Sequence, residues 1–140
     1  MLAEALERMP HSGRMRLIAE VREATPERIL CHGGDHHDAG YPLRLDGRLA
    51  PVAMIELGAQ AAAAHASLFG IGGAHIGLLL ALRAVRLAGA EPDALAPPLE
   101  ASAERMGETP DGAHYRFRVG KRDDAVIEGE AFLSIRALAQ

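Results

Sequence analysis

One segment constrains the fold of this chain more than any other: an alanine-rich, apolar stretch that begins at Pro51. Proline is favoured at the first helical position, where its missing N–H costs nothing, and glycines at 70, 72 and 73 end the pattern. The sequence therefore predicts a helix from Pro51 to about Phe69. Because this helix is too apolar to lie on a surface, we expect it to be buried by the rest of the chain.

An acidic residue interrupts this apolar helix. Glu56 falls near its start, and glutamate is almost never fully buried without a partner or a task. Gln60 follows four residues later and shares the same helix face, and Ala63 and Ser67 continue that line as a groove of small side chains. A buried helix with one acid facing a slot suggests a chemical site. The alternative is that Glu56 is simply exposed at the edge of a sheet.

Composition excludes several classes of protein. A length of 140 residues predicts a single domain, residues 1–140, that can bury a core. The formal net charge of −4 and the scattered basic residues argue against binding of nucleic acid. We see no apolar run of about 20 residues, as a membrane span requires. The single cysteine, Cys31, forms no internal disulfide, so we expect a cytoplasmic protein with Cys31 in its core.

The rest of the chain is patterned mainly as strands. We expect them at 15–22, 28–32, 76–87, 99–106, 115–119 and 126–135, with a short helix at 2–8. In the first strand, Leu17, Ala19 and Val21 alternate with outward residues, and Asp111-Gly112 predicts a hairpin turn. The His-rich segment 33–48 is a long loop, and such loops are usually functional or disordered. This order indicates an α+β fold, with an antiparallel sheet wrapped around one long central helix.

Four segments carry a resemblance to a known family: the Pro10-His11 opening within 9–21, the His-rich loop 35–49, the helix segment 55–60 with Glu56, and the strand 79–85. Together they resemble the hotdog fold. More narrowly, they resemble the FabZ-like 3-hydroxyacyl-ACP dehydratases of the divergent branch found with aryl-polyene and related polyketide clusters. The resemblance covers nearly the whole chain.

This resemblance implies a hydro-lyase that removes water from a 3-hydroxyacyl thioester to give a trans-2-enoyl thioester. Such an elimination needs a base for the α-proton and an acid for the leaving hydroxyl. A histidine suits the first task, and a carboxylic acid kept protonated by burial suits the second. Glu56 matches the acid of the family. The substrate would arrive on an acyl carrier protein or coenzyme A, and we expect no cofactor and no metal.

The resemblance also implies shared active sites, because in the family the histidine and the acid come from different subunits. We therefore expect a homodimer or a dimer-based oligomer. His36 best matches the loop histidine, although it lies twenty residues before Glu56, further than the FabZ spacing. His37 would replace it after a shift of one residue. His11 is the third candidate, since a base must be rigidly held and long loops are mobile.

The chain departs from the family at the start of the helix. Pro51 replaces the glycine whose N–H polarises the thioester carbonyl, and proline has no N–H. The donor would then be the Val52 N–H, at the positive end of the helix. With Gln60 and Ala63, Val52 completes the predicted substrate-binding residues. His65, on the opposite side of the helix, is expected to cap carbonyls or face solvent.

Two other functions remain open at this point. One is a hotdog acyl thioesterase, in which Glu56 activates water, and the replacement of glycine by Pro51 is its best argument. The other is a non-catalytic acyl-binding or structural subunit of a fatty-acid or polyketide synthase complex.

Overall fold

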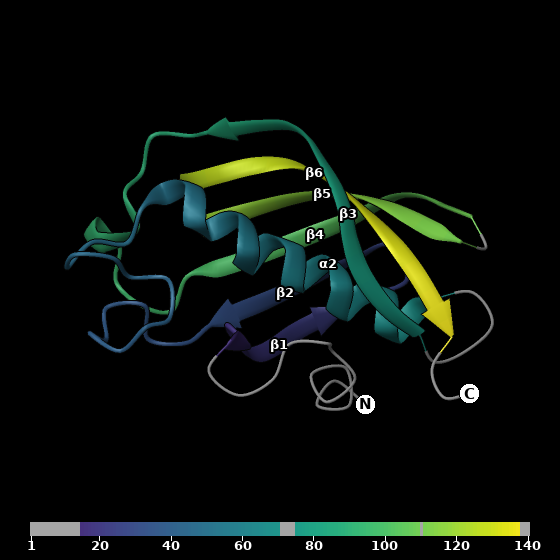
Figure 1. Ribbon diagram of the computed structural model, residues 1–140, viewed down its shortest axis with the longest axis horizontal. Helices are drawn as coiled ribbons and strands as arrows, with labels where there is room; N and C mark the ends of the chain where they lie inside the picture. Colours follow the sequence, from purple (N-terminus) through teal and green to yellow (C-terminus); the bar gives the residue numbers. More distant parts are fainter. Residues whose placement is uncertain (1–14, 71–74, 110, 138–140) are drawn as a thin grey trace.

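The computed structural model describes residues 15–70, 75–109 and 111–137, so the predicted helix at 2–8 lies outside it. Within these ranges a six-stranded antiparallel sheet curves around one long helix (Figure 1). The elements in chain order are β1 Ile18–Ala24, β2 Arg28–Gly33, η2 Pro51–Met54, α2 Ile55–Phe69, β3 His75–Leu87, η3 Pro92–Ala94, β4 Glu100–Thr109, β5 Gly112–Lys121 and β6 Asp124–Ala137. The sheet order is β1-β2-β4-β5-β6-β3. The expected α+β arrangement is confirmed.

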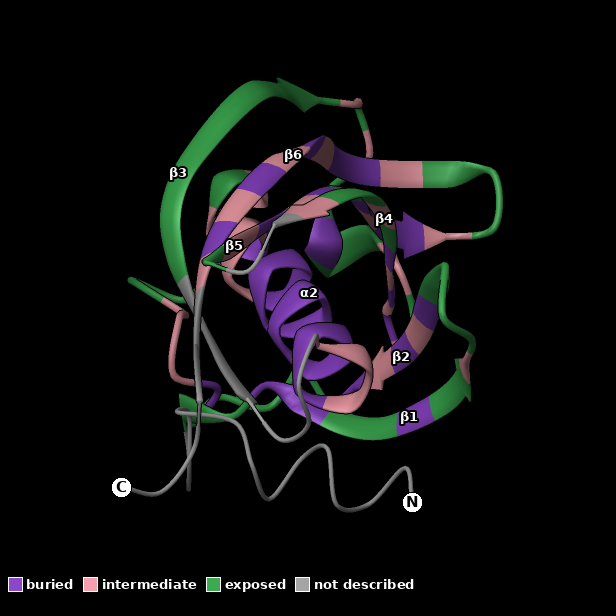
Figure 2. Ribbon diagram, turned by 90° about the vertical axis from the view of Figure 1, so that its right-hand side faces the viewer, coloured by how far each residue is buried: buried purple, intermediate pink, exposed green. Residues whose placement is uncertain are grey.

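The central helix has the predicted bounds, divided into a 3-10 turn, η2, and the α-helix α2. All residues from 57 to 67 are buried (Figure 2). Gly58 is required by packing, because a Cβ there would lie 2.4 Å from a ring carbon of Phe117. Pro51–Phe69 is long and apolar enough to cross a membrane, but two thirds of it is buried inside the sheet, as in a core helix.

The inner face of the sheet supplies the other half of the core. Its buried side chains from the four consecutively paired strands are Ile29, Cys31, Ala101, Ala103, Tyr115, Phe117, Val119, Ile127, Ala131 and Leu133. The core position expected for Cys31 is confirmed, and burial raises the pKa of its thiol to about 12. This cysteine is therefore protonated at neutral pH.

The predicted alternation in the first strand is wrong. Leu17 and Ile18 are both buried, whereas Ala19 is exposed. The reason is that β1 pairs with β2 through two register shifts, between Ile18 and Glu20 and again after Val21. Each irregularity moves the following side chains to the other face of the sheet.

Gly112, which was expected in the turn, is already part of β5, where it pairs with Thr109 of β4.

The edge strand β3 leaves apolar side chains on the surface. It pairs with β6 through its other edge, and residues 79–87 are all exposed (green in Figure 2). The large apolar side chains among them are Leu79, Leu80, Leu82, Val85 and Leu87. A bulge at Ala84, with φ of 53°, interrupts the pairing. An edge strand presents unpaired backbone groups to which another chain can bind, and an exposed apolar patch is typical of an interaction surface.

Candidate functional site

Glu56 and Gln60 are in contact, as their spacing predicts. Glu56 is partly exposed in the first turn of α2, whereas Gln60 is fully buried. The Gln60 Nε2 donates to Glu56 Oε1 at 3.2 Å and to the Met15 carbonyl at 2.7 Å, and its Oε1 accepts the Leu17 N–H at 2.7 Å. Gln60 therefore ties the acid to the chain that enters β1.

The small side chains on the same helix face are enclosed. Ala63 and Ser67 are 3% and 1% exposed, so within one protomer this line is not open to solvent. Among the described residues, the buried Ser67 Oγ has no hydrogen-bond partner. The substrate-binding roles of Gln60 and Ala63 stay predictions.

Val52 lies at the N-terminal end of the central helix. Its side chain is 55% exposed, and it follows Pro51 in the first turn of η2. The first N–H groups of a helix have no intrahelical carbonyl to bind, and they lie at its positive end. The Val52 N–H therefore has the position expected of a donor to an anionic oxygen, and that role stays a prediction.

His36 is buried, with its hydrogen-bonding state defined by the backbone. Its Nε2 lies 2.8 Å from the Pro92 carbonyl oxygen and 2.9 Å from that of Leu95. Since carbonyls only accept, Nε2 carries the hydrogen and Nδ1 carries the lone pair. Within the described residues, that buried Nδ1 has no hydrogen-bond partner. Burial lowers the pKa of His36, so the ring is neutral at pH 7 and Nδ1 is its basic atom.

The loop that carries His36 is joined to its surroundings by hydrogen bonds and by an ion pair. Within it, Asp35 Oδ1 accepts the His37 N–H and Asp38 Oδ1 accepts the Gly40 N–H. The loop is joined to η3 through Arg44, which pairs with Asp93. These contacts hold the His36 loop to η3, whereas His11 was the candidate favoured by rigidity, and the choice between them stays a prediction. His11 itself lies outside the described residues.

His37 is exposed and differs in environment from its neighbour. The two imidazole rings meet edge to face, with centroids 4.4 Å apart. His36 thus lies inward and His37 outward, and both belong to a turn in which the Asp38 N–H binds the Asp35 carbonyl.

His65 is fully buried, so the expectation that it faces solvent is wrong. The expectation that it binds a backbone carbonyl is confirmed. Its Nε2 lies 2.8 Å from the Thr25 carbonyl oxygen, and its Nδ1 lies 2.7 Å from the Tyr115 hydroxyl. The imidazole donates to the carbonyl and accepts from the hydroxyl. The β1–β2 turn and β5 cover this side of α2, which local sequence does not indicate. Burial lowers the pKa of His65.

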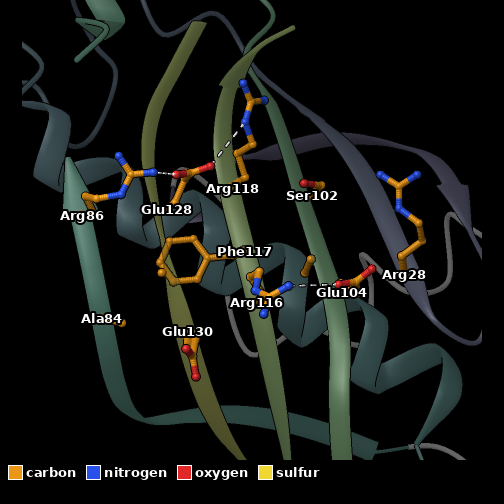
Figure 3. Close-up of a pocket in the computed structure, with 12 residues that line it drawn as sticks. Arg28, Ala84, Arg86, Ser102, Glu104, Arg116, Phe117, Arg118, Glu128 and Glu130 are labelled. Carbon is orange, nitrogen blue, oxygen red and sulfur yellow. Dashed lines mark hydrogen bonds and ion pairs between the residues drawn. The ribbon is translucent and has the colours of Figure 1, made fainter. Parts of the chain in front are cut away.

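A cleft of about 570 Å³ lies on the outer face of the sheet, away from these residues (Figure 3). Its charged side chains largely pair with one another. Glu128 binds Arg86 and lies 3.8 Å from Arg118, and Glu104 lies 3.7 Å from Arg116. None of the predicted site residues that the structure describes lines this cleft, so the cleft lies apart from the candidate site.

Comparison with solved structures agrees with this fold. A structure described as the dehydratase heterocomplex ApeI:P from Xenorhabdus doucetiae matches with a TM-score of 0.77 at 18% identity, covering 96% of this chain and 91% of that chain. A thioesterase from Haemophilus influenzae matches with a TM-score of 0.66 at 12% identity, covering 86% and 80%. A hypothetical thioesterase with coenzyme A from Streptococcus pneumoniae matches with a TM-score of 0.64 at 10% identity, covering 86% and 88%. At these identities the likeness shows the fold, which is the hotdog fold.

No curated protein sequence shows significant similarity to this chain. A family model does: the model described as ApeP-like, ApeP dehydratase, matches residues 3–131. That match includes the His-rich loop, the whole central helix and five of the six strands in full. The chain therefore belongs to the ApeP-like family of hotdog-fold dehydratases.

Proposed function

We propose that this protein removes water from a 3-hydroxyacyl thioester and forms a trans-2-enoyl thioester, with the acyl group carried by an acyl carrier protein or coenzyme A. The observation that carries the proposal is the placement of Glu56. In a chain of a dehydratase family, it is the acid at the start of the buried central helix, and Gln60 holds it there by a hydrogen bond.

The proposed elimination assigns one task to each group. The His36 Nδ1 removes the α-proton, and Glu56 as the acid gives a proton to the β-hydroxyl, which leaves as water while the Cα–Cβ double bond forms. The Val52 N–H binds the thioester oxygen as negative charge develops there. His36 suits its task because Nε2–H is bound by two carbonyls, which leaves Nδ1 as the accepting atom.

The proposed site is shared between two protomers joined along β3. Exposed leucines on that edge strand supply the apolar contact surface, and the unpaired backbone of an edge strand can extend the sheet into a neighbour. We propose a homodimer, and a complex with a different hotdog chain is the other outcome, since the Xenorhabdus relative is described as a heterocomplex. Light scattering at micromolar concentration tests this, because a stable monomer would refute a shared site.

The cytoplasmic location stays a prediction from Cys31.

The reaction is tested by following the mass of a 3-hydroxyacyl thioester incubated with the protein. We expect loss of one water with the thioester intact. Release of free thiol without an enoyl product would favour the thioesterase, for which the replacement of glycine by Pro51 is the argument. Neither product, across chain lengths and both carriers, would identify a non-catalytic acyl-binding subunit.

A further inference from the structure

The ion pair of Arg44 and Asp93 joins the His36 loop to η3 and to the segment that precedes the central helix. Arg44 pairs with Asp93, and it also donates through Nε to the His36 carbonyl at 3.1 Å and through its NH1 nitrogen to the Gly47 carbonyl at 3.2 Å. The other oxygen of Asp93 accepts the Leu49 N–H at 3.1 Å. Both segments lie at the same end of the molecule (Figure 1).

This ion pair connects the two groups of bonds that hold His36: the bonds to its ring and the bond to its backbone. The ring is bound by the carbonyls of Pro92 and Leu95, which flank Asp93, while the His36 backbone is bound by Arg44. The spacing between the loop and η3 therefore determines whether Nε2 reaches both carbonyls. On the other side, Leu49 precedes Pro51 by two residues, so its bond to Asp93 anchors the segment that leads into the helix.

We propose that Arg44 and Asp93 are a positioning pair, which holds the His36 imidazole in its Nε2–H state and the start of the helix in one geometry. The proposal rests on the proposed function for its catalytic consequence. Neither side chain needs to touch the substrate.

The side-chain chemistry explains why this pair is suited to the task. The planar guanidinium of Arg44 binds two carbonyl oxygens and a carboxylate at once, whereas a lysine ammonium on a flexible stem does not reproduce that fork. Asp93 uses its two oxygens for two different partners, Arg44 and the Leu49 N–H. Arg44 is only 11% exposed, so solvent replaces its bonds poorly.

The chain offers a matched control. Arg48 and Glu91 join the same two segments at 3.0 Å, but their side chains are 60% and 49% exposed. The side chain of Arg48 reaches Glu91 rather than the backbone of His36 or Leu49. Arg48→Gln and Glu91→Gln therefore remove one ion pair between the segments while the proposed positioning bonds remain.

The first measurement is steady-state dehydration by the full-length protein. We expect Arg44→Gln and Asp93→Asn to lower kcat by about 10-fold or more, with KM changed less than about 3-fold, because small displacements of a catalytic group are costly. Arg44→Lys should fail to restore kcat, and the two controls should stay within about 2-fold of the parent. Equal losses in the controls, or unchanged kcat in both variants, would overturn the proposal.

The second measurement does not depend on activity. Nitrogen-15 NMR of the imidazoles, with His36 identified by the signal lost in His36→Gln, reports its tautomer and pKa. The charged or titratable groups that act on the His36 ring are His37 and Asp35, and Arg44 of the ion pair binds the His36 carbonyl. If the pair positions the ring, both variants should admit solvent, mix the tautomers and raise the pKa of His36.

A pure charge effect gives a different result in the same spectra. Loss of the Arg44 cation would raise the pKa of His36, whereas loss of the Asp93 anion would lower it. Opposite shifts with an unchanged tautomer would therefore refute positioning. A parent protein that dehydrates nothing would refute the proposed function alone, and the spectra would still decide whether the pair positions His36.

Discussion

Replacing Gln60 by leucine should both destabilise the protein and disturb the acid. Leucine has nearly the same volume, so the main loss is the three hydrogen bonds of the buried amide, to Leu17 N–H, the Met15 carbonyl and Glu56. The buried Leu17 N–H is then left unsatisfied, which costs about 1–3 kcal/mol. The Met15 carbonyl and Glu56 are partly exposed and can bind water instead. We therefore expect Gln60→Leu to lower the free energy of unfolding by about 1–3 kcal/mol.

Urea denaturation of the parent and the variant measures this loss, and Gln60→Glu tests the effect of an added charge at the same position. Glutamate keeps an oxygen for the Leu17 N–H but has no donor for Met15 or Glu56, and it adds a like charge beside the acid. Gln60→Glu should therefore destabilise the protein at least as much as Gln60→Leu, because a carboxylate buried beside Glu56 costs more than one unsatisfied N–H, and it should lose at least as much turnover. An unfolding free energy for Gln60→Leu within about 0.5 kcal/mol of the parent, the range of ordinary surface substitutions, would refute this account of the amide.

Glu56→Gln keeps the shape of the side chain but cannot donate a carboxylic proton, so it should lower turnover by roughly 10²-fold or more with the dimer intact. If the variant instead unfolds and the protein that remains folded keeps full specific activity, Glu56 is a structural acid. In steady-state rates of dehydration, His36→Ala should abolish turnover and His37→Ala should leave most of it. The reverse order, or a loss of turnover only when His11 is substituted, would contradict the choice of His36 as the base. The folded protein should lose stability as the pH falls below about 6.5, the ordinary pKa of histidine. Burial lowers the pKa values of His36 and His65, so below that pH the unfolded chain binds protons that the folded chain refuses. Unfolding free energies at pH 7.5 and pH 5.5 measure this loss, and His65→Gln should show a smaller pH dependence than the parent.

The sequence determined those features that depend on local periodicity and on the chemistry of neighbouring residues. Pro51 and the glycines after Phe69 bound the central helix correctly, because helix start and stop signals act over a few residues. The contact between Glu56 and Gln60 follows from their spacing on one helix face. A helix without a polar face must be covered, which is why a sheet wrapped around it was predictable.

The tertiary structure alone decided which distant groups complete each polar side chain. The carbonyls that bind His36 come from 56 and 59 residues further along the chain, and the Tyr115 hydroxyl that binds His65 lies 50 residues away. Two register shifts reset the buried face of β1, although its residues alternate locally. Local patterns carry the periodicity of single elements, whereas hydrogen-bond partners across the fold depend on how the elements pack, and in this protein the state of His36 depends on such partners.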